Sequence, residues 1–258
     1  MDMRIPEQGY REIVQARTRA ALDAAMYVRD AWESLLWTAA VHPGQQDAVN
    51  VALMAYQAPG ELLGSVGEWE VRGRRVVPGA QVRGLIYAGV PGQRAIQVRE
   101  WVAPEVPRPV ITGGVCVALY DLGQTEAVPG AVEVAPEAIV PVLLLAPERI
   151  EAAGRELLRE MGAAAPGAEG AAGVLSALGR EVFARHVGAG PLPLDREGEA
   201  ESVAYLAGLM LGAPGLMFPP LPRVEYGAAG HPYGPARSVL TDVIQQGRSL
   251  ALRVYRQS

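Results

Sequence analysis

The stretch from Asn50 to Val90, NVALMAYQAPGELLGSVGEWEVRGRRVVPGAQVRGLIYAGV, decides the fold class of this chain. Its apolar residues first recur at helical spacing, which predicts a short helix over 46–56. After a proline–glycine breaker, polar and apolar residues alternate. This alternation predicts strands over 69–77 and 81–90, with a turn at Pro78-Gly79 between them. A helix followed by a strand pair indicates an α+β fold.

The pattern extends in both directions from this stretch. Upstream, a helical periodicity predicts one long helix over 9–41, ended by His42-Pro43-Gly44. Downstream we expect strands at 93–102 and 115–120, a low-complexity loop at 162–173, and helices at 174–187, 197–211 and 235–255. The expected architecture is therefore N-terminal helices packed on a small antiparallel sheet, followed by a mainly helical part. We place the domain boundary between 1–145 and 146–258.

The composition bounds the class of protein. The chain has 258 residues, half of them apolar, and a net charge of −5, so a sizeable core is expected and a globally basic surface is not. No run of 18 or more apolar residues occurs, and the N-terminus does not resemble a signal peptide. We expect a cytoplasmic protein without a membrane span. The single Cys116 excludes an internal disulfide framework and is expected to be a small buried hydrophobe.

Positive charge is distributed unevenly along the chain. All 23 basic residues are arginine, whose planar guanidinium pairs with phosphate and stacks on bases. Seven arginines lie between Trp69 and Arg108 against three carboxylates, whereas 110–170 holds nine carboxylates and three arginines. The sequence therefore predicts a local positive patch in the front half of an acidic protein.

The motifs of common enzyme classes do not occur. With three histidines and one cysteine, a site built mainly from His and Cys ligands is excluded, and we expect no metal or cofactor. The chain has no nucleophile elbow, phosphate loop or dinucleotide-binding glycine motif. His42 lies at a predicted helix end and His231 in a glycine-rich loop, so we expect capping or solvated roles for both.

The front half carries candidate groups for binding a nucleic acid. Asn50 and Gln57 are seven residues apart and share one face of the predicted helix, where both amides can contact bases or phosphates. Trp69 is followed by Arg72, Arg74 and Arg75. An exposed ring with arginines on a strand pair suits a single strand, because rings stack on bases while arginines follow the backbone.

A plain structural interpretation competes with this one. A tryptophan at the start of a strand is more often part of the core, and the arginines are equally consistent with a solvated face paired with Glu68 and Glu70.

Three blocks of the sequence resemble ArdC-type antirestriction proteins. The first is the run from Asn50 through Gln57-Ala-Pro59 and Trp69 to Gly73-Arg74-x-Val76 and Gly79. The second is Tyr120-Asp121-Leu-Gly-Gln124-Thr125-Glu126, similar to a family segment in which a strand closes the domain. The third is Glu199-Ala-Glu-Ser-Val-Ala-Tyr205, similar to a helix of the family's metallopeptidase-like half. The resemblance implies single-stranded-DNA binding by the front half.

The chain also departs from the family pattern. Lysines usually surround the turn at Gly79, but here it reads Pro78-Gly79-Ala80-Gln81, with Arg75 and Arg83 as compensating cations. In the back half the zincin motif His-Glu-x-x-His should precede Glu199. In that register Arg180 and Ala184 replace both histidines while Glu181 remains, so zinc hydrolysis is not expected. Glu199 and Glu201 are expected to cap the helix or pair with Arg180 or Arg185.

The sequence thus favours a single-stranded-DNA-binding protein, acting in antirestriction or in DNA repair, with an inactive back half that serves as a scaffold, a homodimer surface or a partner-binding module. The predicted DNA-binding residues are Asn50, Gln57, Trp69, Arg72, Arg74, Arg75 and Arg83. Two alternatives stay open at this point. One is a metal-dependent peptidase with the unusual ligands Glu181, His186 and Glu199. The other is a protein-interaction scaffold that binds no nucleic acid.

Overall fold

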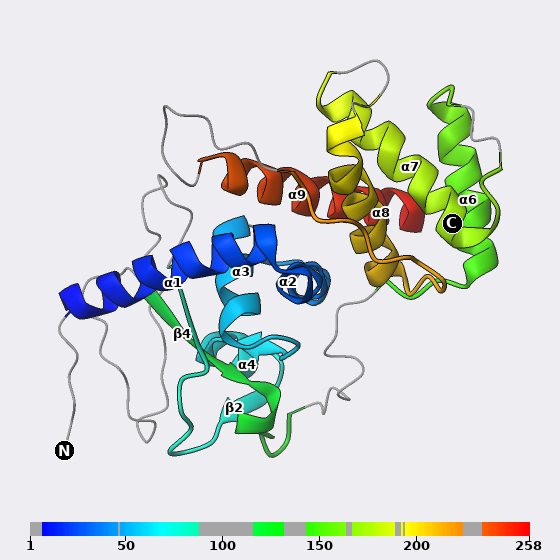
Figure 1. Cartoon of the computed structure of the whole chain (residues 1–258). Coiled ribbons are helices and arrows are strands. Elements are labelled where there is room, and N and C mark those ends of the chain that lie inside the picture. The colour runs from blue at the N-terminus through cyan, green and yellow to red at the C-terminus, as the bar shows by residue number, and fades with distance from the viewer. Residues whose placement is uncertain are drawn as a thin grey trace.

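A computed structural model describes residues 7–45, 47–87, 116–131, 143–163, 167–188, 192, 194–223 and 234–258. The fold is α+β, as predicted, with N-terminal helices above a small antiparallel sheet and further helices to one side (Figure 1). The expected strand at 93–102 and His231 lie outside the described residues.

Three helices form the front of the molecule: α1 (Glu7–Tyr27), α2 (Arg29–Val41) and α3 (Ala48–Gln57). The single helix predicted over 9–41 is wrong, because Val28 adopts an extended conformation (φ −117°, ψ 117°) and divides it. The bend redirects the chain so that the apolar faces of both α1 and α2 reach the core. Helix α3 agrees with the prediction, and the Asp47 side chain caps it by accepting from Val49 N at 2.8 Å.

Two small antiparallel sheets lie below these helices. One has the order β1 (Leu63–Gly64), β4 (Cys116–Asp121), β3 (Gly84–Tyr87), and the other pairs β2 (Arg74–Val76) with β5 (Thr125–Ala127). The prediction that 69–77 and 81–90 pair with each other is wrong. Both segments contain a strand, but β2 pairs with β5 at the end of the second motif block, and β3 pairs with β4, which leads into that block, about 30 to 50 residues further on. Cys116 is buried, as expected.

The back half is helical. Its described residues form α6 (Pro147–Glu160), α7 (Gly170–His186), α8 (Glu197–Leu211) and α9 (Gly234–Gln257). One-turn 3-10 helices lie directly before α8, at Leu194–Arg196, and in the front half, at Leu122–Gln124. The last three α-helices agree with the predicted ranges. Helices α7 and α8 approach closely at Gly179, where an added Cβ would lie 2.6 Å from the Ala200 carbonyl oxygen. Among the described residues no helix has the length and apolar character needed to cross a membrane.

One apolar core runs through both halves of the chain. It contains residues from α1 to α3 together with residues from α6 to α9. Trp32 of α2 is fully buried and its indole Nε1 donates to Ser202 Oγ of α8 at 3.1 Å. The boundary at 145/146 stays a prediction, and buried apolar residues from both sides of it belong to the same core.

A buried arginine on α9 closes the end of α2. Arg248 donates from Nη2 to the carbonyl oxygens of Ala39 (2.8 Å) and His42 (2.7 Å), and from Nη1 to that of Gln45 (2.6 Å). A cation at a helix C-terminus satisfies orphan carbonyls and favours the helix dipole. Burial lowers the pKa of Arg248 to about 10, which leaves it charged at neutral pH.

Candidate nucleic-acid interface and candidate metal ligands

The two predicted amides lie on the same helix face, as expected, but they bind the backbone of β3. Asn50 is 2% exposed, its Nδ2 donates to Tyr87 O at 3.0 Å, and its Oδ1 accepts from Tyr87 N at 2.9 Å. Gln57 repeats this arrangement with Leu85, at 2.9 Å and 3.1 Å. Because β3 is an edge strand, the two amides take the place of a neighbouring strand. Both residues therefore hold the fold.

Trp69 is in the core and offers no face for base stacking. It lies in α4 (Val66–Val71), whose first turn is fixed by a capping box between Ser65 and Glu68. Its side chain is fully buried, and Nε1 donates to Tyr120 O at 3.0 Å. An added Cβ on Gly64 would lie 2.9 Å from Trp69 Cε2, so the glycine makes room for the ring. The predicted stacking role of Trp69 is wrong.

Arg72 packs against the ring that it was expected to flank. Its guanidinium carbon lies 5.2 Å from the centroid of the Trp69 ring, a cation–π contact. Its Nη1 is buried and has no hydrogen-bond partner among the described residues. The charge of Arg72 also acts on His42, whose pKa falls to about 4 because of burial first, and then because of Arg72 and Arg248. His42 caps α2, as expected.

The other three arginines are bound by groups from the second motif block and from Glu61. Arg74 donates from Nε to Thr125 Oγ1 at 2.7 Å and from Nη2 to Thr125 O at 2.9 Å. Arg75 pairs with Glu126 across the β2–β5 ladder at 2.7 Å. Arg83 donates from Nε to Glu61 Oε2 at 3.0 Å, and the same nitrogen lies 3.3 Å from Asp121 Oδ2.

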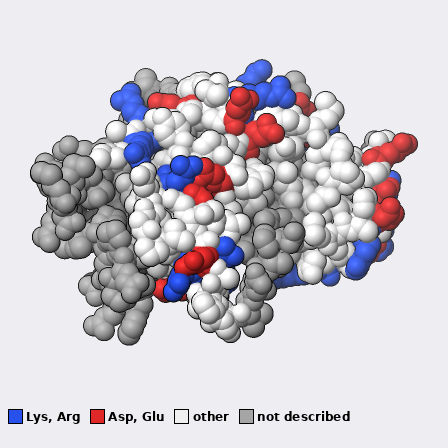
Figure 2. Space-filling model, turned by 90° about the horizontal axis from the view of Figure 1, so that it is seen from below, with Lys and Arg blue, Asp and Glu red and all other residues white. Residues whose placement is uncertain are grey.

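In the part of the predicted positive patch that the structure describes, folding places carboxylates beside the arginines, whereas Arg94, Arg99 and Arg108 lie outside the described residues. The described residues of 58–87 and 116–131 carry four arginines and five carboxylates, because the second block brings Asp121 and Glu126 beside the arginines. Figure 2 shows positive and negative side chains next to each other on this lower face rather than a continuous basic surface. A surface without net positive charge has little electrostatic attraction for a phosphate backbone.

The remaining residues of the second block are structural as well. The Asp121 side chain accepts from Gln124 N at 3.2 Å, while Gln124 Oε1 accepts from Asp121 N at 3.1 Å, which forms a second capping box. Gln124 Nε2 also donates to Gln81 O at 2.8 Å and holds the chain that leads into β3. The polar residues Asp121 and Gln124 of the second block therefore have structural roles inside the fold.

In the back half, the acidic residues that the resemblance to a zincin singles out are paired with arginines. Arg180 pairs with Glu201 at 2.7 Å, as predicted, and Glu181 pairs with Arg185 at 2.6 Å. Glu199 is fully buried and bound by Arg196, with Nη2 to Oε2 at 2.5 Å, rather than by either predicted arginine.

His186 Nε2 lies 3.1 Å from Asp242 Oδ1. Each of the ligands in the peptidase alternative, Glu181, His186 and Glu199, therefore has a separate partner. Burial raises the pKa of Glu199, and the Arg196 hydrogen bonds oppose this shift. Within the described ranges, no group of three or more His, Cys, Asp or Glu residues is placed to hold a metal.

Comparison of the chain with protein-family profiles, with curated proteins and with solved structures gives no match. The resemblance to ArdC-type proteins therefore stays a prediction from the sequence.

Proposed function

We propose that this chain is a non-enzymatic interaction protein, related in architecture to ArdC-type proteins, whose ligand is another polypeptide. The observation that supports the proposal is that the groups expected to face DNA are used within the fold. The amides of Asn50 and Gln57 close the edge of β3, Trp69 is buried, and Arg75 is paired with a carboxylate. A site built for DNA would present such groups to solvent.

The surroundings of Arg180 and Glu199 support the proposal that the chain is not an enzyme. A zincin needs two neutral imidazoles one helical turn apart and a nearby carboxylate to complete the metal site. Here the first imidazole position is Arg180, a permanent cation, and the carboxylate of Glu199 is bound by Arg196 in the interior. Binding a divalent cation there would require breaking the ion pair between Arg196 and Glu199 and moving the positive charge of Arg180 away.

Single-stranded-DNA binding, in antirestriction or DNA repair, is the second candidate. It is favoured by the exposure of Arg75 and Arg83, whose side chains are 56% and 46% exposed despite their ion pairs. Exposed ion pairs contribute about 0–1 kcal/mol, so a phosphate is able to displace the carboxylate. With few such contacts, the salt dependence of binding would be shallow.

Fluorescence anisotropy with a labelled single-stranded oligonucleotide, from roughly 50 to roughly 200 mM salt, separates the two candidates. The first proposal expects no saturable, salt-sensitive binding. Salt-sensitive binding that is lost when Arg75→Ala and Arg83→Ala are combined, but kept in the exposed control Arg253→Ala, would establish the second candidate instead. Metal analysis of protein purified without chelator completes the test, since stoichiometric zinc would contradict a non-enzymatic role.

A further inference from the structure

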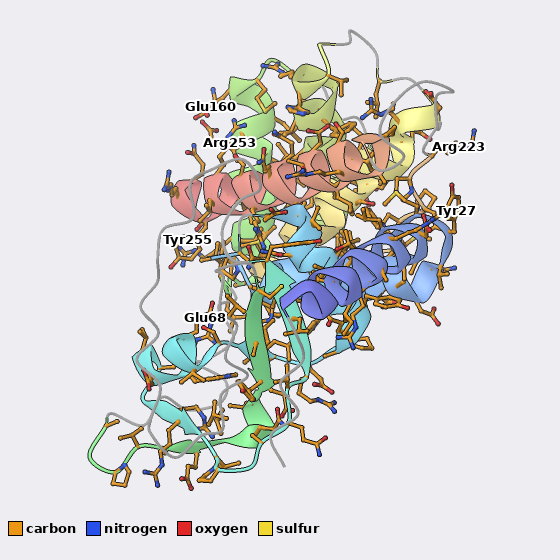
Figure 3. All side chains as sticks on the ribbon, turned by 90° about the vertical axis from the view of Figure 1, so that its left-hand side faces the viewer. Tyr27, Glu68, Glu160, Arg223, Arg253 and Tyr255 are labelled. Atoms are coloured by element: carbon orange, nitrogen blue, oxygen red, sulfur yellow. The ribbon has the colours of Figure 1, made fainter. Side chains whose placement is uncertain are left out.

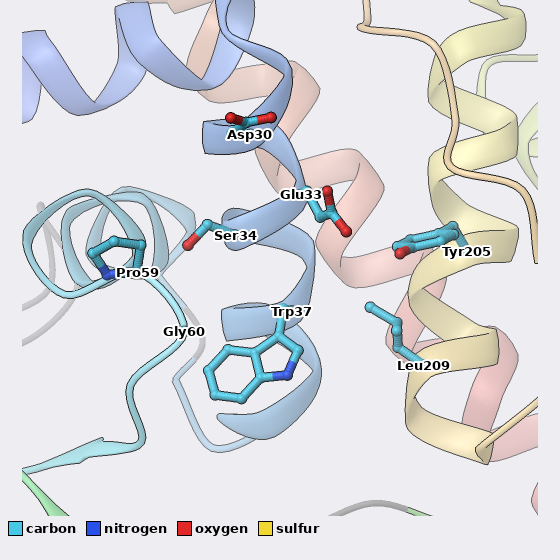
Figure 4. A pocket seen from close by; sticks show the side chains of 8 residues that line it. All are labelled: Asp30, Glu33, Ser34, Trp37, Pro59, Gly60, Tyr205 and Leu209. Atoms are coloured by element: carbon cyan, nitrogen blue, oxygen red, sulfur yellow. The ribbon is translucent and has the colours of Figure 1, made fainter.

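A groove between α2 and α8 has a volume of about 370 Å³. From α2 it is lined by Asp30, Glu33, Ser34 and Trp37, which lie on one helix face, and from α8 by Tyr205 and Leu209, one turn apart. The turn after α3, at Pro59-Gly60, forms a further wall. Figure 4 shows the Glu33 carboxylate directed toward Tyr205, with the Trp37 ring lower down and turned toward the Gly60 side.

The groove combines negative charge with aromatic surface. Asp30 and Glu33 are exposed at its rim, and neither forms an ion pair among the described residues. Glu33 acts on Tyr205, whose pKa is raised by burial first and then by this neighbouring negative charge. The Tyr205 ring is held edge-on to Phe218, with ring centroids 5.5 Å apart.

Arg29, the arginine of α2 next to Asp30, already contacts an aromatic ring. Arg29 lies over the Phe218 ring, with its guanidinium carbon 4.9 Å from the ring centroid. It does not neutralise Asp30 or Glu33 by an ion pair in the described contacts. Phe218, which contacts Tyr205 of the groove, thus already carries a guanidinium on its ring face.

We infer that this groove binds an arginine side chain of a partner polypeptide. Two unpaired carboxylates attract a cation, a guanidinium donates to them in a planar fork, and the Trp37 and Tyr205 rings favour a planar cation over a compact one. The carboxylates of Asp30 and Glu33 are exposed, whereas Trp37, Tyr205 and Leu209 are half-buried, which suits a side chain with a cationic end and an apolar stem. The inference rests on the proposed function and names the chemistry of its partner.

NMR titration of the whole chain tests this assignment. The probe is a blocked pentapeptide with a central arginine between glycines, and the matched control replaces that arginine with citrulline, which has the same shape but no charge. The indole N–H signal of Trp37, identified with Trp37→Phe, is the reporter. Trp32 and Trp69 are internal references, because their indoles are buried and hydrogen-bonded.

We expect the arginine peptide to shift the Trp37 signal in a saturable manner and the citrulline peptide to leave it unchanged. Glu33→Gln combined with Asp30→Asn should weaken binding by roughly fivefold, since exposed charge pairs contribute modestly. Glu70→Gln removes one exposed carboxylate from α4, away from the groove, and should have no effect.

Equal binding of the citrulline peptide, an unchanged affinity in the double variant, or tighter binding of free spermidine than of the arginine peptide would overturn the assignment. Self-association that disappears in the double variant would also overturn it, because the occupant would then be a second copy of the chain. Salt-sensitive oligonucleotide binding contradicts the proposed function itself. A silent Trp37 signal without oligonucleotide binding contradicts the groove assignment alone.

Discussion

Replacing Asn50 by alanine tests whether the motif amides serve the fold or a ligand. The substitution removes two hydrogen bonds and leaves the N–H and C=O of the half-buried Tyr87 without these partners. Each unsatisfied buried group costs about 1–3 kcal/mol, so we expect Asn50→Ala to lower the free energy of unfolding by about 3 kcal/mol. At about 2–4 °C for each kcal/mol in a chain of this size, the melting temperature should fall by roughly 6–12 °C.

The assay is thermal and urea unfolding followed by circular dichroism. Gln81→Ala is the matched control, because its side chain is exposed and its change should stay within about 0.5 kcal/mol. Asn50→Asp keeps the acceptor for the Tyr87 N–H but sets a carboxylate against the Tyr87 carbonyl, so it should be destabilised at neutral pH and recover in acid. If Asn50→Ala unfolds like Gln81→Ala, the edge-closing role is refuted.

Three further predictions concern the interior. Arg248→Met should lower the free energy of unfolding by about 3 kcal/mol, because it leaves the carbonyls of Ala39 and His42 without their partner. The control Arg253→Met, at an exposed position of the same helix (Figure 3), should change this free energy by less than about 0.5 kcal/mol. Burial first, and then the charges of Arg72 and Arg248, lower the pKa of His42 from its ordinary 6.5 to about 4 in the folded chain, so the unfolded chain binds more protons between these pH values. Stability is therefore lost as pH falls from 6.5 toward 4, and between pH 7 and 5 the parent should lose about 2 kcal/mol more than His42→Asn in urea unfolding. Gly179→Ala should lower the melting temperature by forcing α7 from α8, at about 1–3 kcal/mol, while Gly67→Ala, in open space on a helix, should be neutral or stabilising.

Local patterns were sufficient to predict most helices of this chain. The α8 range agrees with the prediction because its apolar positions and the glycine that follows are all local signals. The break at Val28 was missed, since no proline or glycine marks it, and α6 was missed although Pro147 begins it. The alternation of polar and apolar residues predicts a strand at Trp69, but the capping box at Ser65 starts a helix there instead.

The candidate site was predicted less well because its contacts are not local. Arg74 and Arg75 are bound by residues 51 positions further along, so a count of nearby charges could not show that they are paired. The amides were placed on one helix face correctly, but periodicity does not show what that face contacts. The second motif block did carry a usable signal for its structural role. A polar segment beside a predicted strand, here Gln124, Thr125 and Glu126, is also typical of capping and of strand pairing.

The position of Arg248 has a consequence for the evolution of this chain. Its guanidinium reaches from the last helix to the end of α2 and binds three backbone carbonyls there, while Trp32 is sealed by Ser202. The back half is therefore needed to complete the core of the front half, whatever its own role. A gene shortened after the first half would encode an α+β fragment with an open apolar face. Descendants of this chain would keep the second half as a structural necessity, while its surface stays free to change.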